Sequence, residues 1–133
     1  MSVPVLAEPG LDELGELYGR YKRLALATGA TLVLGEHPAA LADAAAALLA
    51  DSRAARAAGG GALAPALSAC VRAAGELHAL LVRALEGAGA VGAADTDRAR
   101  ATHSSLRREV WKVIPCEYVP CSAVHRHDHR GVR

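Results

Sequence analysis

The residues best suited to chemistry lie close together near the carboxyl end of the chain. They are two cysteines and three histidines within fourteen residues: Cys116, Cys121, His125, His127 and His129. Zn²⁺ in proteins prefers four nitrogen or sulfur ligands in a tetrahedron, and thiolates with imidazoles are donors that it selects. The spacing therefore predicts a transition-metal site in this segment, with zinc as the first choice of metal.

Four of these residues suffice for a tetrahedral site, with Cys116, Cys121, His125 and His127 as first-choice ligands and His129 as the spare. The spacing departs from that of common structural zinc sites, which often add a second, distant pair of ligands. One alternative is a solvated tail whose thiols and imidazoles hold nothing. Another is a disulfide between the two cysteines, although the pair lacks the C-x-x-C spacing of redox proteins.

Three further residues of the same chemical types stand earlier in the chain: Cys70, His78 and His103. Each lies in a segment with helical periodicity, where it is either an ordinary core residue or an extra ligand for a tail that folds back. The signatures of phosphate-binding loops, dinucleotide-binding folds, zinc proteases and serine hydrolases are missing from the sequence. A non-enzymatic role is favoured, and a small enzyme with Cys116 or Cys121 as nucleophile stays an alternative.

The composition predicts that helices position these residues. Hydrophobic residues make up 52% of the 133 residues, yet aromatic residues make up 3% and phenylalanine is absent. Alanine and leucine dominate, and both favour helices, whereas strands prefer β-branched and aromatic side chains. The length is that of one domain. The high content of alanine, glycine and arginine also suggests a bacterial genome rich in G and C.

Apolar residues recur at helical spacing in four segments, at about residues 11–28, 38–58, 64–86 and 96–113. Their similar lengths and short connections predict an all-α fold, an antiparallel up-and-down four-helix bundle over residues 1–114. An irregular Cys/His-rich tail, 115–133, follows as part of the same domain or as a flexible extension. We expect Gly29 to end the first helix, and Thr31–Leu34 to form a buried connector or a helical turn.

Local signals place two further features on the last helix. Asp95 or Thr96 is suited to cap its start. The single tryptophan, Trp111, lies near its end, where it either plugs an otherwise small-residue core or anchors a partner. Gly15 and Gly19 in the first helix are four residues apart, so they mark either a close helix contact or two flexible positions.

The charge pattern limits the partners. The net charge is +1, so no overall field favours nucleic acid or an anionic membrane. From Arg98 onward, eight basic residues stand against three acidic ones, and a solvated helix face is favoured over phosphate binding because stacking aromatic residues are missing. The first residues lack the pattern of a signal peptide, so we expect a cytoplasmic protein.

Two function classes follow from these features. The first is a helical accessory protein whose tail holds a metal, as a structural clip or a sensing site. The second is a protein-interaction or homo-oligomerisation module in which the tail is incidental. An exposed apolar stripe on the bundle would be a mark of this second class.

Overall fold

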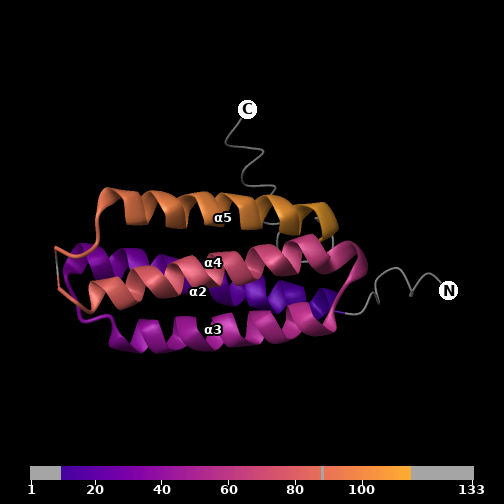
Figure 1. Ribbon diagram of the computed structural model, residues 1–133, viewed down its shortest axis with the longest axis horizontal. Coiled ribbons are helices and arrows are strands. Elements are labelled where there is room, and N and C mark those ends of the chain that lie inside the picture. Colours follow the sequence, from indigo (N-terminus) through magenta and orange to yellow (C-terminus); the bar gives the residue numbers. More distant parts are fainter. Residues whose placement is uncertain (1–9, 88, 115–133) are drawn as a thin grey trace.

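The computed structural model describes residues 10–87 and 89–114, and within these residues the chain is all-helical. The helices are α2 (Leu11–Leu34), α3 (Ala39–Ala58), α4 (Ala64–Ala84) and α5 (Ala93–Val113), with a short 3₁₀ turn at Gly61–Leu63 before α4. They lie lengthwise against one another, and each runs opposite to the one before it (Figure 1). The predictions of an all-α fold and of four successive antiparallel helices are confirmed for this part of the chain.

Helix α4 is the centre of the packing, because it contacts each of the other three helices. Nine of its residues are buried, and leucines at helical spacing form the larger part of their volume. Helix α3 packs on α4 and α2, while α5 packs chiefly on α4. Helices α2 and α5 therefore both flank α4, but they have little contact with each other.

The first helix is six residues longer than the sequence predicted. Gly29 does not end it, because α2 continues to Leu34 and ends at Gly35, whose φ of 71° lies in the left-handed region that favours glycine. The amide of Glu36 then donates a hydrogen bond to the carbonyl of Thr31 at 3.1 Å. A glycine inside a helix costs only about 1 kcal/mol relative to alanine, so Gly29 does not by itself end α2.

The segment Thr31–Leu34 is consequently helical, as one of the two alternatives stated. The other alternative, a buried connector, is wrong, and the second half of the segment is exposed. Thr31 is buried, but Val33 is 85% exposed and Leu34 is 68% exposed. A large apolar surface at the end of α2 therefore faces outward.

The last helix begins at Ala93, three residues earlier than predicted, and neither Asp95 nor Thr96 is its N-cap. Gly92 occupies that position in an extended conformation, and Asp95 stands three residues into the helix. The Gly92 amide donates to Asp95 Oδ2 at 2.9 Å, so the aspartate satisfies a backbone donor at the helix start from within the first turn. Helix α4 ends at Ala84, two residues before the predicted boundary.

The apolar stripe of α5 is narrow. Within the helix only Leu106 and Val110 are buried, and Ile114 follows them beyond its end. The predicted inward positions Ala99, His103 and Val113 are partly buried. A stripe of this width can cover one neighbouring helix but not two, which explains why α5 packs on α4 and leaves α2 apart.

Candidate functional site

A groove lies between α2 and α5, where the two helices do not close on each other. Its first half is a cavity of about 370 Å³. The floor comes from Leu77 and Leu80 of α4. The α2 wall consists of Tyr21, Ala25, Thr28, Gly29 and Leu32, and the α5 wall of Thr96, Ala99, Arg100 and His103. Most of this lining is apolar, so the groove offers a hydrophobic surface to a binding partner.

The groove continues to the end of the bundle. A second cavity of about 440 Å³ shares Leu32 and Thr96 with the first and reaches the loops at Gly35 and Gly87. Glu36 and His37 lie at this end, beside Leu85. Because the two cavities share residues, they form one depression along α2 and α5, which we call the α2/α5 groove.

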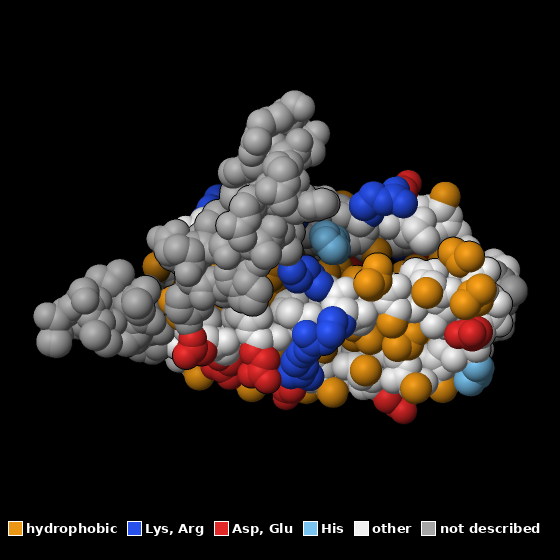
Figure 2. All heavy atoms as spheres, turned by 180° about the vertical axis from the view of Figure 1, so that it is seen from behind, with side chains coloured by type: hydrophobic (Ala, Val, Ile, Leu, Met, Phe, Trp, Pro, Cys, Tyr) orange, Lys and Arg blue, Asp and Glu red, His pale blue; other side chains and the backbone are white. Residues whose placement is uncertain are grey.

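Large hydrophobic side chains stand exposed on α2 outside the lining of both cavities, three residues before and four residues after Gly29 of the groove wall. Leu26 is 79% exposed, and Val33, seven residues later, is 85% exposed. Residues seven apart return to nearly the same angle on a helix, so the two side chains share one face. Figure 2 shows hydrophobic side chains gathered over one end of this face of the molecule, with Lys, Arg, Asp and Glu side chains mainly across its middle and lower edge.

One pair of rings bridges the groove. The centroids of the Tyr21 and His103 rings are 5.4 Å apart, with the planes tilted by 57°. Burial, with a smaller effect of Tyr18, raises the pKa of Tyr21 to about 12. Burial also lowers the pKa of His103, and the positive charges of Arg107 and Lys22 lower it further. Both rings are therefore neutral at pH 7 and add to the apolar character of the groove.

Cationic side chains flank this half of the groove on both helices. The Lys22 ammonium lies over the Tyr18 ring, 4.8 Å from its centroid. On α5, the Arg107 guanidinium lies 5.1 Å from the centroid of the Trp111 ring. Cations over aromatic faces are stabilised by the ring quadrupole and keep their charge at the surface.

A third cation, Arg100, lines the groove itself. Its guanidinium lies 3.2 Å from Asp97 in an ion pair in which both side chains are largely exposed. Such pairs contribute little to stability because water and salt screen them. The positive charge of Arg100 therefore stays accessible to a partner in the groove.

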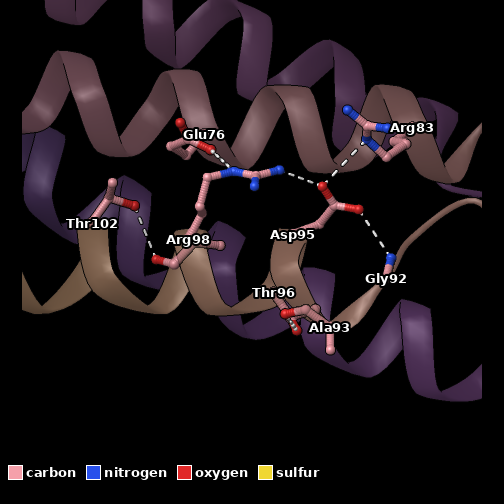
Figure 3. A network of polar contacts seen from close by, with 9 residues as sticks. Glu76, Arg83, Gly92, Ala93, Asp95, Thr96, Arg98 and Thr102 are labelled. Atoms are coloured by element: carbon pink, nitrogen blue, oxygen red, sulfur yellow. Dashed lines mark hydrogen bonds and ion pairs between the residues drawn. The ribbon is translucent and has the colours of Figure 1, made fainter.

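A polar network fixes α5, and with it one wall of the groove, to α4 (Figure 3). Asp95 accepts from the Gly92 amide, pairs with Arg98 and lies 3.4 Å from Arg83 of α4. Arg98 also reaches Glu76 of α4 at 3.7 Å. The hydrogen bond from Gly92 lowers the pKa of Asp95 most, and the two arginines lower it further. This network sets where the α5 wall begins.

The predicted metal ligands Cys116, Cys121, His125, His127 and His129 lie outside the described residues. Within residues 10–87 and 89–114, no three histidine, cysteine or acidic side chains are grouped as a metal site requires. The metal site therefore stays a prediction from the spacing.

The structure places the cysteine and histidines that stand earlier in the chain in different environments. Cys70 is buried in α4, and burial raises its pKa to about 12. His78 is partly buried on α4, and His103 lies in the α2/α5 groove. Cys70 is thus a core residue, and only His103 belongs to the candidate site. Trp111 is partly buried against the core, as expected of a residue near the end of the bundle.

Sequence reasoning missed the α2/α5 groove. The sequence predicted a buried connector or a helical turn at Thr31–Leu34, and it gave no expectation for Leu26. The available signal was the pair Leu26 and Val33, which recur seven residues apart, off the main apolar stripe of α2.

Comparisons of this chain with known proteins identify no similar protein. No protein-family model, curated protein or solved structure matches the chain. None of the helices in the described ranges combines the length and apolarity that a bilayer span requires.

Proposed function

We propose that this chain is a helical protein-interaction module, and that the α2/α5 groove takes an amphipathic helix from a partner protein. The observation that carries the proposal is the apolar α2/α5 groove, together with Leu26 and Val33, which are exposed at 79% and 85% on the face of α2 next to the groove residue Gly29. Exposed apolar surface next to a concave site is a feature of interaction surfaces.

The dimensions of the groove favour a helix as the occupant. Its α2 wall extends from Tyr21 to Gly35, which at 1.5 Å per residue corresponds to roughly 21 Å, or about four helical turns. Two antiparallel helices form its sides, and leucines of α4 form its floor. An amphipathic helix would insert side chains at positions i, i+3, i+4 and i+7 into such a groove.

The chemistry of the groove supports binding better than covalent catalysis. The phenol of Tyr21 in the groove has a pKa of about 12, so its oxygen stays protonated and is a weak nucleophile at pH 7. Cys70, in the adjacent core, is held in its thiol form by burial. His103 is neutral and contacts Tyr21 through its ring.

A neutral helical peptide tests the proposal. The probe is a fluorescently labelled peptide of about four turns, with leucines on one face and glutamines on the other. We expect it to bind the full chain, and we expect the Leu26→Ser/Val33→Ser variant to weaken binding by about tenfold or more, since anchor residues carry most interface energy. Fluorescence anisotropy measures the affinity.

Two further variants make the test specific. Ala25→Leu/Ala99→Leu places bulk in the groove from both walls and should also abolish binding. Val82→Ser is the control for loss of an exposed apolar side chain elsewhere, because Val82 is 40% exposed on α4, whereas Leu26 and Val33 lie on the surface of α2 next to Gly29 of the groove wall. Equal binding by the wild type and both groove variants would overturn the proposal, as would equal weakening by Val82→Ser.

The metal-binding accessory role proposed from the tail spacing is a separate candidate. Its support is the Cys116-x4-Cys121-x3-His125-x-His127-x-His129 pattern. It rests on residues other than those that line the groove in the described part of the chain, so the two roles are tested independently.

A further inference from the structure

The charges around the α2/α5 groove have one dominant sign. Lys22 on the α2 side and Arg100 and Arg107 on the α5 side are cationic. Lys22 on α2 and Arg107 on α5 do not line the cavities, but both lie close enough to the groove residue His103 for their charges to lower its pKa. Their combined field therefore reaches into the groove and is not confined to its outer edges.

The acidic residues near the groove do not cancel this positive field. Asp97 pairs with Arg100, but its own side chain is 69% exposed, so the pair is open to water and to competing charges. Glu36 lines the second cavity, at the end of the bundle, and so lies away from the half of the groove that contains His103. The half of the groove that contains His103 is thus flanked by cations, and an acidic residue, Glu36, lies at the end of the groove formed by the second cavity.

We infer that the partner helix taken by the groove has an apolar stripe flanked by acidic residues, which face Lys22, Arg100 and Arg107. This inference rests on the function proposed above and adds the chemistry of the partner. The apolar stripe meets the leucine floor, and its edge meets Leu26 and Val33 on the adjoining face of α2. The flanking carboxylates meet cations on both walls, and such charge complementarity fixes orientation and speeds association.

A second copy of this chain fits the groove less well. In a dimer with two-fold symmetry, the same surface of both copies forms the interface. Each groove would then bring its own Lys22, Arg100 and Arg107 to a surface that already carries them. Like charges facing each other oppose association, so the cationic flanks favour a different, acidic chain.

Three peptides with one leucine stripe separate the possibilities. Their flanking residues are glutamate, lysine or glutamine, and each is titrated with the full chain. We expect the glutamate peptide to bind about tenfold more tightly than the lysine peptide at low ionic strength, and the difference to shrink as salt is added. The variant Lys22→Glu/Arg100→Glu should reverse the order of the two charged peptides, with the glutamine peptide little changed. Circular dichroism confirms that the variants stay folded.

The outcomes distinguish the inference from the proposed function. If the three peptides bind equally and all are lost in Leu26→Ser/Val33→Ser, the groove binds helices but the acidic partner is wrong. If none binds, both ideas are wrong. If sedimentation reveals a dimer of the chain alone that Leu26→Ser/Val33→Ser dissociates, the occupant is a second copy and the acidic partner is excluded.

Discussion

The rings of Tyr21 and His103 meet across the α2/α5 groove, with centroids 5.4 Å apart and planes tilted by 57°. They come from α2 and α5, the first and last helices of the described residues, which otherwise have little contact. The pair is thus a rare direct link between α2 and α5. It couples the protonation of one imidazole to the stability of this side of the bundle.

Protonation of His103 should destabilise the fold. Burial, then Arg107 and Lys22, lower the pKa of His103 from its ordinary value of 6.5, so the unfolded chain binds this proton more tightly than the folded chain. The contribution of neutral His103 to the unfolding free energy is therefore fully present above pH 6.5. It is lost as the pH falls from 6.5 through the lowered pKa of the folded state. The variant His103→Phe keeps a ring against Tyr21 but cannot titrate.

Urea unfolding at pH about 7.5 and about 5 measures this effect. The wild type should lose more unfolding free energy between the two values than His103→Phe does. Identical losses in the two proteins would show that His103 does not titrate differently in the folded state.

The hydroxyl of Ser52 should be a source of instability. Its side chain is fully buried in α3, and Oγ has no hydrogen-bond partner among the described residues. Removing a buried, unsatisfied polar group is favourable, so Ser52→Ala should raise the free energy of unfolding by about 1 kcal/mol. Ser68→Ala is the control, because Ser68 accepts a hydrogen bond from Arg56 Nε at 2.8 Å. That variant should be neutral or slightly destabilised, and a loss of stability in Ser52→Ala would contradict the geometry.

Two leucines on α2 should differ sharply in their contribution to stability. Leu14 is fully buried in the core. Leu14→Ala should lower the unfolding free energy by about 3 kcal/mol through lost burial and the cavity left behind. Leu34 is 68% exposed, and Leu34→Ala should change the unfolding free energy by less than about 0.5 kcal/mol. Chemical denaturation of both variants compares them directly. Similar costs at the two sites would mean that the exposed end of α2 is covered in the folded protein.

The tail prediction is tested by metal uptake. Calorimetric titration with Zn²⁺ should give binding with proton release in the wild type, since thiolate ligands must lose their protons. The variant Cys116→Ser/Cys121→Ser should lose this uptake. Its remaining thiol, Cys70, is buried with a pKa of about 12, so it should be alkylated slowly at neutral pH and rapidly in denaturant. Equal zinc uptake by both proteins would remove the thiolates from the site.

Much of the helical architecture could be predicted from the sequence because its signals are local. Helical spacing predicts one face of the helix from Leu11 onward. Its residues Leu11, Leu14, Leu17, Tyr18 and Tyr21 are buried, whereas Leu24 and Ala25 on the same face are partly buried. Helix boundaries were less predictable. Whether Gly29 or Gly35 ends α2 depends on the packing of the turn between them, and local glycine content does not report that packing.

The candidate site is a property of tertiary structure. Its residues come from α2, α4 and α5, and the groove exists because α5 has too narrow an apolar stripe to close onto α2 while it packs on α4. Nothing local to Leu26 and Val33 shows that no neighbouring helix covers them. The sequence by itself determined the helices and their inward faces, because helical periodicity is set by residues three or four apart. Only the assembled bundle decided which apolar residues stay exposed, because exposure depends on the distance between helices that are far apart in the chain.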